Sequence, residues 1–462
     1  MKNWMNRAAA VIALVAVSAG VVMVGGPVAP SAVAQSPGLG AGGEYHPLTP
    51  TRIHDSRVPG LDVAPTGKKP TSAGGSAYSI PVLGRGGVPS TASDVLAVVV
   101  GVVVAEPQRA GYMALYPTGS GAGTSSLVNF QAGRNVPNLA IVAVGDAGKV
   151  TIDVTTPAGN SKAHVIVDVF GWFSTSSSAD RGARLHVTDP DRIFDSRETS
   201  SRIGAAQSRS VKVLGTPKVP NDPSITGVVL NITAVNERPG SRDTFISVTP
   251  DAVPAGTQPT TSNVNIVRGQ IKATMAIMPI GADGNVHIYN SAGDTDVVLD
   301  VLGYMKEGSA ADTLTGRVIP LTAPFRVFDT RLAAFGNVPL GPGRAENWSL
   351  KKFADSVMLN GFPVGEQAGL IGNLTGTRLQ RYHPTVPAST YMSLYPGASS
   401  RPNTSNLNLV ENEDVPNLSL LKYGTVDANS GDSVPPDPYV VQAFNFGGYL
   451  HYLLDVFAVV LK

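Results

Sequence analysis

Hydrophobic residues along the chain fall into continuous runs and alternating runs, and the same order of runs occurs three times. The continuous runs are 95–104, 227–235 and 369–375, and the alternating runs that follow them are 111–117, 244–250 and 390–396. A period of two is typical of a β-strand with one buried face. The residues that it places on the core side are Met113, Leu115, Ile246, Val248, Met392 and Leu394.

Short runs of this kind predict an all-β protein. Turn residues separate them, and the chain contains 50 Gly and 36 Pro, which favours strands and turns over long helices. The best candidate for an amphipathic helix is the short segment 349–360. We therefore expect β-sandwich modules with jelly-roll or Greek-key connections between their strands.

Two short motifs mark the beginning and the end of each copy. A motif of the form Arg-Ile/Val-Phe/His-Asp-Ser/Thr-Arg opens the copies at 52–57, 192–197 and 326–331, and an Asp-Val motif closes them at 168, 300 and 455. This spacing is that of whole domains, not of a solenoid repeat. The predicted modules are module 1 (45–173), module 2 (185–305) and module 3 (318–462), joined by linkers at 174–184 and 306–317.

The first 34 residues have the features of a signal peptide that is cleaved on export. Lys2 and Arg7 precede an apolar stretch at 8–26, and the small residues 32–34 are suited to cleavage. The Gly-rich segment 35–44 is typical of a flexible spacer. We therefore expect a secreted, extracellular protein, free or associated with the cell wall, with no stable transmembrane segment after cleavage.

Charge and cysteine content exclude several classes of partner and chemistry. The chain has 35 Lys and Arg against 34 Asp and Glu; without Lys2 and Arg7 the balance is 33 against 34, a net charge of −1. This argues against nucleic acid as a partner. The absence of cysteine excludes disulfides, a thiolate nucleophile and a cysteine-bound metal.

The closing aspartates lie in strands that are otherwise apolar. A carboxylate buried there is costly unless it is paired and hydrogen-bonded, and the only cations that recur in all three copies are the arginines of the opening motif. We therefore predict a charge clamp in each module, with its first and last strands side by side. The predicted clamp residues are Arg52, Arg57 and Asp168, then Arg192, Arg197 and Asp300, then Arg326, Arg331 and Asp455.

Two histidines precede a closing aspartate by four residues. His164 and His451 hold this position in the first and third copies, and Asp296 holds it in the second. No third ligand recurs beside them, so an exposed histidine at a strand end is favoured over a metal site. The sequence predicts no metal and no cofactor.

The sequence carries no signature of an enzyme. It has no nucleophile elbow, no zinc-binding helix motif and no phosphate loop, and a carboxylate pair for glycoside hydrolysis is recognised only by its separation in space. A recognition surface is the stronger candidate. Tyrosines on the outward face of the alternating strands, beside asparagines of the next strand, resemble a sugar-binding groove; these residues are Tyr112, Tyr116, Asn129, Tyr391, Tyr395 and Asn408. Alternatively, the rings pack against a neighbouring strand or module.

Taken together, the opening motif at 192–197, the segments 391–396 and 404–409, and the closing motif at 300–304 resemble a β-rich tandem repeat. This repeat occurs in secreted and cell-surface proteins of high-GC Gram-positive bacteria, the actinobacteria. The resemblance implies an extracellular location and a structural or binding role, and it supplies no catalytic residues. The chain departs from the repeat at His54, at Ala458 and Val459, and in insertions at 378–386 and 429–438.

These features predict a non-enzymatic protein of the cell envelope that acts in adhesion or glycan binding through its β-sandwich modules. Its expected partners are cell-wall or extracellular glycans, or other surface proteins. One alternative is a secreted carbohydrate-active enzyme whose carboxylates are unidentified, and another is a purely architectural surface protein. The linkers allow the modules to pack around a pseudo-threefold axis or to form a string of beads.

Overall fold

The computed structural model describes residues 42–462 with gaps at 59–68, 72–76, 122, 124, 157–160, 176–177, 199–200, 260, 309–313, 360–366, 385–387 and 427–435. The predicted signal peptide and all but the last residues of the predicted spacer lie outside the described residues. Within them, no helix has the length and apolar character needed to cross a membrane.

Almost all regular structure in the described residues is β, which confirms the prediction of an all-β sandwich fold. Module 1 contains β1 (Tyr45–Asp55), β2 (Lys69–Thr71), β3 (Ala77–Pro81), β4 (Val95–Ala105), β5 (Gly111–Pro117), β6 (Val128–Phe130), β7 (Val136–Ala143), β8 (Lys149–Thr155) and β9 (Ser161–Ser174). Module 2 contains β10 (Ala183–Asp195), β11 (Gln207–Lys212), β12 (Ile225–Val235), β13 (Thr244–Thr249), β14 (Val264–Ile266), β15 (Ile271–Pro279), β16 (Asn285–Asn290) and β17 (Asp296–Glu307). Module 3 contains β18 (Val318–Asp329), β19 (Arg344–Ser349), β20 (Gln367–Gln380), β21 (Ser389–Pro396), β22 (Leu407–Val410), β23 (Val415–Lys422), β24 (Gly424–Val426), β25 (Asp437–Asn445) and β26 (Tyr449–Leu461).

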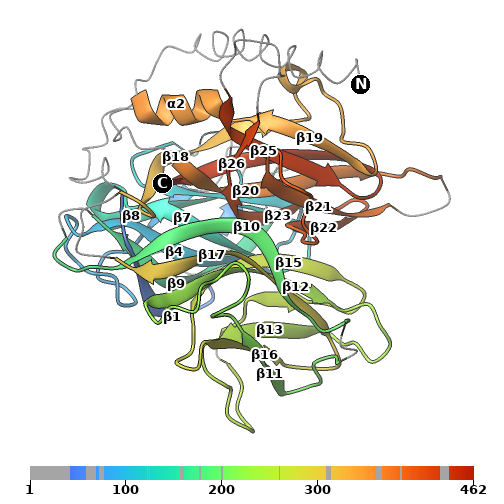
Figure 1. The fold of residues 1–462 in the computed structure, drawn as a ribbon, viewed down its shortest axis with the longest axis horizontal. Helices are drawn as coiled ribbons and strands as arrows, with labels where there is room; N and C mark the ends of the chain where they lie inside the picture. Colours follow the sequence, from blue (N-terminus) through green and yellow to red (C-terminus); the bar gives the residue numbers. More distant parts are fainter. Residues whose placement is uncertain are drawn as a thin grey trace.

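The same pair of antiparallel sheets occurs in each module (Figure 1). The inner sheets have the order β1-β9-β4-β7, β10-β17-β12-β15 and β18-β26-β20-β23, and the outer sheets have the order β3-β8-β5-β6, β11-β16-β13-β14 and β19-β25-β21-β22. This is the strand order of a jelly roll, in which the first and last strands of the module are neighbours. The short strands β2 and β24 pair with parts of β9 and β25, which are interior strands of their sheets.

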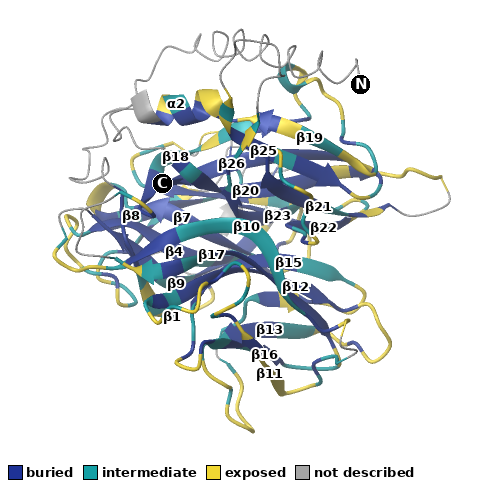
Figure 2. Cartoon of the chain, in the orientation of Figure 1, coloured by how far each residue is buried: buried dark blue, intermediate teal, exposed yellow. Residues whose placement is uncertain are grey.

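The core of each module lies between its two sheets, as the alternating period predicts. Met113 and Met392 have no exposed surface, and Leu115 is 1% exposed. Figure 2 shows that buried residues follow the strands and that exposed residues concentrate in the connecting loops. The segment that was the best candidate for an amphipathic helix contains α2 (Lys351–Leu359), which packs Phe353, Ala354 and Val357 against the core of module 3.

Three equivalent strands of the inner sheets, β7, β15 and β23, contact one another and bring the modules together. Leu139, Met275 and Leu418 on these strands belong to one apolar cluster that includes residues of all three modules. Gly43 pairs with Val318, and Tyr45 pairs with Ala183, so the starts of the three first strands also meet. The modules therefore pack in a closed ring around a pseudo-threefold axis and not as a string of beads (Figure 1).

A buried charge cluster joins the modules where their first strands start. Glu44, Arg184 and Arg317 occupy equivalent positions, each directly before a strand residue that pairs with the last strand of its module. One carboxylate oxygen of Glu44 lies 3.1 Å from Nε of Arg184 and 3.6 Å from a guanidinium nitrogen of Arg317. All three residues are at most 5% exposed. The predicted spacer and linkers are thus wrong at these three positions, because Glu44, Arg184 and Arg317 are buried where the starts of the first strands pack against one another.

Candidate functional site

The structure does not support an outward platform made of all the predicted tyrosines. Tyr112 is 40% exposed, but Tyr116 and Tyr395 are only 8% and 4% exposed, and Tyr391 is half-buried. The first strand of a neighbouring module packs on each of their strands, β18 on β5 and β10 on β21. The prediction of an outward-facing ring is therefore wrong for Tyr116 and Tyr395. Their rings follow the alternative interpretation, in which they pack against a neighbouring strand or module.

Module 3 nevertheless carries a group of aromatic rings that reaches its surface, which we call the aromatic strip: the exposed Phe446, the half-buried Tyr391 and the buried Phe444, which is 5% exposed. The rings of Tyr391 and Phe446 are stacked, with centroids 4.8 Å apart and planes 17° apart, and Phe446 is 57% exposed. The Phe444 ring lies 6.1 Å from that of Tyr391. The guanidinium of Arg401 lies over Phe444, 4.1 Å from its centroid, which is within the range of a cation–π contact.

The loop that carries Phe446 is held by buried hydrogen bonds. The Asn445 side chain, which has no exposed surface, donates to the carbonyls of Leu340 and Gly448 at 2.8 and 2.9 Å. It accepts a hydrogen bond from the Thr390 hydroxyl at 2.6 Å, and that hydroxyl accepts one from the backbone N–H of Gly447 at 2.8 Å. The exposed ring is therefore positioned before any ligand arrives.

Strand register shows that the stack of Tyr391 on Phe446 belongs to module 3 alone, although module 2 has Phe245 and Tyr289 at the positions of Tyr391 and Phe444. Phe446 follows the residue that pairs with Met392, and the equivalent positions in modules 2 and 1 are Ser291 and Thr155. The sequence analysis did not identify Phe446, Phe444 or Arg401. Phe446 could have been found by aligning the three copies along β25 and its counterparts, because it stands where the other two copies have the small hydroxyl residues Ser291 and Thr155.

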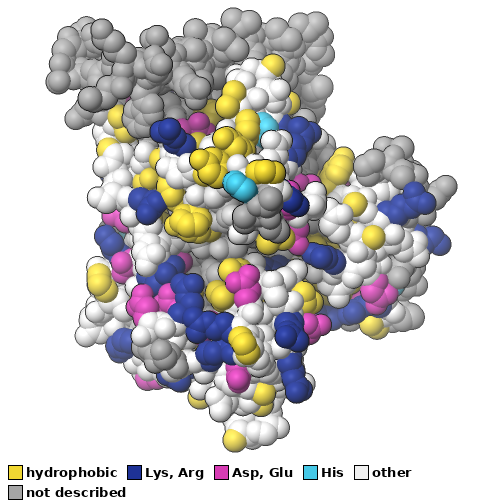
Figure 3. Space-filling view, turned by 90° about the vertical axis from the view of Figure 1, so that its right-hand side faces the viewer, with side chains coloured by type: hydrophobic (Ala, Val, Ile, Leu, Met, Phe, Trp, Pro, Cys, Tyr) yellow, Lys and Arg dark blue, Asp and Glu magenta, His cyan; other side chains and the backbone are white. Residues whose placement is uncertain are grey.

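A second exposed aromatic pair lies in the same module. The rings of Tyr382 and Tyr449 are 6.3 Å apart, and these residues are 70% and 38% exposed. Figure 3 shows hydrophobic side chains gathered on the upper part of one face, while charged side chains dominate below. The upper part corresponds to module 3 in Figure 1.

The predicted asparagines lie beside the tyrosines but bind within their own loops. Asn408 pairs across the strands with Tyr391 and donates to the Ser405 hydroxyl at 3.3 Å. Asn129 pairs with Tyr112 and donates to the Ser126 hydroxyl at 3.2 Å. Both asparagines are half-buried, so each keeps part of its amide at the surface near an aromatic ring.

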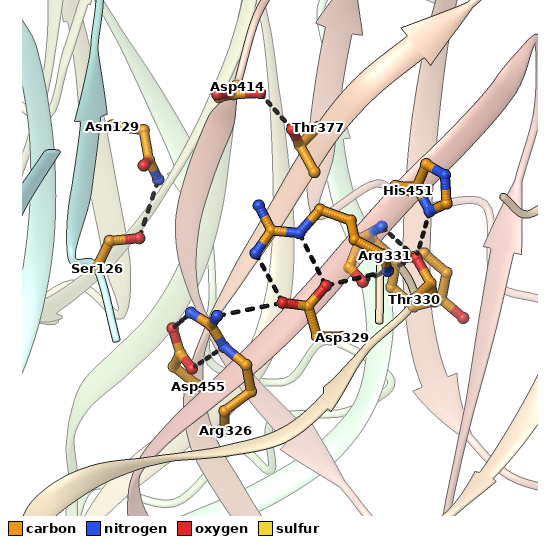
Figure 4. A network of polar contacts seen from close by, with 11 residues as sticks. Ser126, Asn129, Arg326, Asp329, Thr330, Arg331, Thr377, Asp414, His451 and Asp455 are labelled. Carbon is orange, nitrogen blue, oxygen red and sulfur yellow. Dashed lines mark hydrogen bonds and ion pairs between the residues drawn. The ribbon is translucent and has the colours of Figure 1, made fainter. Parts of the chain in front are cut away.

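In all three modules the closing aspartate binds the first of the two predicted clamp arginines and not the second. The first arginine of each opening motif donates from Nε to the closing aspartate; the distances are 2.8 Å for Arg52–Asp168, 2.9 Å for Arg192–Asp300 and 2.8 Å for Arg326–Asp455. The second arginine binds the aspartate of its own motif instead, in the pairs Arg57–Asp55, Arg197–Asp195 and Arg331–Asp329. Figure 4 shows the cluster of module 3, in which Arg326 bridges Asp455 and Asp329. All the carboxylates of the two motifs are therefore engaged with arginine.

Burial and ion pairing shift the pKa values of these carboxyls in opposite directions. Burial raises the pKa of Asp300 to about 6, and it also raises the pKa of Asp455, in both cases against the opposing effect of the paired arginine. Hydrogen bonding from Arg57 lowers the pKa of Asp55 to about 2. The charged forms of Asp300 and Asp455 are thus disfavoured by burial, whereas the pairing with arginine favours the charged form of Asp55.

We expect the contribution of Asp300 to stability to fall as the pH rises. Its folded pKa of about 6 exceeds its ordinary value of 3.8, so the folded state binds more protons between these values and the free energy of unfolding decreases across that window. A carbon-detected NMR titration is expected to show the Asp300 carboxyl inflecting near pH 6. An inflection near pH 4 would contradict this burial effect.

The two histidines are paired with hydroxyl groups inside the modules. Nδ1 of His164 lies 2.9 Å from the Ser56 hydroxyl, and Nδ1 of His451 lies 3.2 Å from that of Thr330. His451 is only 6% exposed, so the expectation of an exposed histidine is wrong there. In module 2 the Ser196 hydroxyl donates to Asp296 at 2.9 Å.

These hydroxyl–histidine pairs have the composition of a nucleophile–base dyad, but their hydroxyl groups are buried and already hydrogen-bonded to the backbone. Ser56 and Thr330 are 1% exposed, and each accepts a hydrogen bond from a backbone N–H of the last strand, at 3.1 and 2.9 Å. They join the first and last strands of the module. Across the described ranges, no group of three His, Cys, Asp or Glu side chains could hold a metal ion.

The described residues define a class: an all-β protein whose paired antiparallel sheets are joined in a closed ring, with aromatic side chains exposed on module 3. No protein-family model matches the chain, and no curated protein matches it.

Proposed function

We propose that this protein is a non-enzymatic binding protein and that its aromatic strip binds a glycan. The observation that carries the proposal is the exposed stack of Tyr391 on Phe446, which stands on a preorganised loop and occurs in one module of three. A sheet whose only role is to pack against its neighbours has no need of an exposed ring such as that of Phe446. Exposed aromatic surface of this kind marks binding sites.

The chemistry of the strip suits a sugar. Flat rings offer apolar area to the C–H face of a pyranose, while their polar neighbours bind hydroxyl groups. Asn408 stands opposite Tyr391, and Arg401 supplies donors beside Phe444. Arg401 also favours a ligand that carries a carboxylate or another anionic group.

The charge clamps support a binding role over hydrolysis. In the described residues, each opening and closing aspartate of the three copies accepts a hydrogen bond from an arginine of the opening motif in the same module. A glycoside hydrolase needs two carboxyls that are free to act on the glycosidic bond. The predicted export signal and the resemblance to actinobacterial surface repeats support a proposed location at the cell envelope.

We expect Tyr391→Ala and Phe446→Ala each to weaken glycan binding by about tenfold, which corresponds to ~1.4 kcal/mol of lost stacking. The protein from residue 35 onward is screened on a glycan array, and the best ligand is titrated calorimetrically. Tyr112→Ala is the matched control, because it removes an exposed tyrosine at the equivalent position of module 1. Unchanged affinity in both module 3 variants, or hydrolysis of the ligand, would overturn the proposal.

A further inference from the structure

Two of the three interfaces in the ring are closed by paired asparagines. Between modules 1 and 3, Asn138 donates from Nδ2 to Oδ1 of Asn373 at 2.9 Å. Between modules 3 and 2, Asn417 donates in the same way to Asn231 at 2.9 Å. All four residues are at most 4% exposed.

The carboxamide that receives this bond is itself held by the partner module. Nδ2 of Asn373 donates to the Ser126 carbonyl at 2.8 Å, and Nδ2 of Asn231 donates to the equivalent Ser405 carbonyl at 2.6 Å. Each interface thus contains one recognition site for a primary carboxamide. A side-chain donor binds its oxygen, and a backbone carbonyl binds its nitrogen.

The third interface, between modules 2 and 1, has the site without the asparagine. By strand register, Gly101 stands where the other modules have Asn231 and Asn373, and Thr274 stands in the place of the donor asparagine. A cavity of about 50 Å³ lies there, lined by Gly101, Phe170, Ser262, Asn263 and Thr274. By the space that one water molecule needs, it holds about four non-hydrogen atoms.

The polar groups that would hold the missing carboxamide are unused. Thr274 is 7% exposed, and its hydroxyl makes no hydrogen bond with any described residue. The carbonyl of Ser262, equivalent to those of Ser126 and Ser405, likewise accepts none within the described ranges. Asp168 lines the same cavity and keeps 17% of its side chain exposed, whereas Asp300 and Asp455 keep none.

We propose that this cavity is a binding site for an acetamido group, the chemical equivalent of the asparagine side chain that the other two interfaces supply. Thr274 donates to the acetamido oxygen, the Ser262 carbonyl accepts from its N–H, and the methyl group packs on the Phe170 ring. Free acetamide and N-acetylated sugars share this group. The site is separate from the aromatic strip, so it stands or falls independently of the proposed function.

The methyl group of Met275 reports on the cavity, because Met275 lines it and is 1% exposed. In a methionine-methyl NMR titration, acetamide and N-acetylglucosamine are expected to shift the Met275 resonance saturably, and glucose is expected to leave it in place. Tighter binding of N-acetylglucosamine than of acetamide would identify a sugar as the source of the group. No saturable shift with either would overturn the proposal.

Two variants separate binding in the cavity from a remote effect. Gly101→Asn with Phe170→Leu gives module 1 the residues that module 2 has at Asn231 and Leu302 and fills the site from within. Phe170 must change because its ring lies 2.6 Å from the Cβ position of residue 101. We expect this variant to lose the shift. Thr274→Val keeps the shape and removes the donor, and it is expected to weaken binding severalfold. Val410→Ala, at an exposed position outside both proposed sites, is the control with unchanged acetamide binding. Full binding by both cavity variants would contradict the assignment.

Discussion

Replacing Arg326 with Ala is expected to lower the free energy of unfolding by about 3–5 kcal/mol, the cost of breaking a buried ion pair from one side. Arg326 donates to both oxygens of Asp455, at 2.8 and 2.9 Å, and to Asp329 at 3.2 Å. The side chain of Asp455 has no exposed surface and that of Asp329 is 1% exposed. Removal of the guanidinium therefore leaves Asp455 charged and unpaired inside the sheet, and it weakens the pairing of Asp329.

Arg52→Ala in module 1 is the matched control. It removes the same contacts, but Arg52 is 40% exposed and Asp168 is 17% exposed, so solvent screens the charges and the expected loss is about 1 kcal/mol or less. Denaturant unfolding, followed by a probe in each module, measures both losses. Equal losses in the two variants would show that burial does not set the strength of the clamp.

Glu44→Ala is expected to destabilise the ring by a similar amount, about 3–5 kcal/mol. Glu44 is the one carboxylate at the position where the other two modules carry Arg184 and Arg317, and its loss leaves two buried guanidinium groups without their shared partner. The cluster joins the starts of all three modules. We therefore expect loss of contact between the modules before the modules themselves unfold.

A double-mutant cycle tests whether Glu44 and Arg317 interact in the charge cluster at the pseudo-threefold axis. Arg317→Ala alone leaves Glu44 paired with Arg184 at 3.1 Å and costs less than Glu44→Ala. Adding Arg317→Ala to Glu44→Ala removes one of the two buried guanidinium groups that lose Glu44, and it is expected to recover part of the stability. Additive losses would mean that the three groups do not interact.

The repeated motifs were enough to predict where the β-strands lie. They also predicted that the closing aspartate of each module lies beside an opening arginine. Alternation placed Met392 and Leu394 in the core because a strand exposes its two faces to different environments. The same alternation placed Tyr395 outside, and it is buried because another module covers the strand. The alternation of residues along one strand cannot predict which of them are buried by packing against another module.

The residues that matter most at the axis and at the surface were missed for a related reason. Glu44 lies at the end of a Gly-rich stretch and looks like spacer until its position is matched to those of Arg184 and Arg317. Phe446 lies in the loop between β25 and β26, and a single aromatic residue in a loop does not by itself predict a binding site. Gly101 is one glycine in an apolar strand. Each becomes informative only when the strand register aligns the three copies and shows which one differs.

The central claim is that ligands bind where the three modules differ. The most direct test is a crystal structure of the protein with an oligosaccharide of N-acetylglucosamine. The account predicts a sugar ring stacked on Tyr391 and Phe446, an acetamido group between Gly101 and Thr274, and no sugar at the equivalent positions beside Ser291 or Asn373. Sugar bound equally at the matching positions of all three modules, or bound at neither of the two sites, would contradict it.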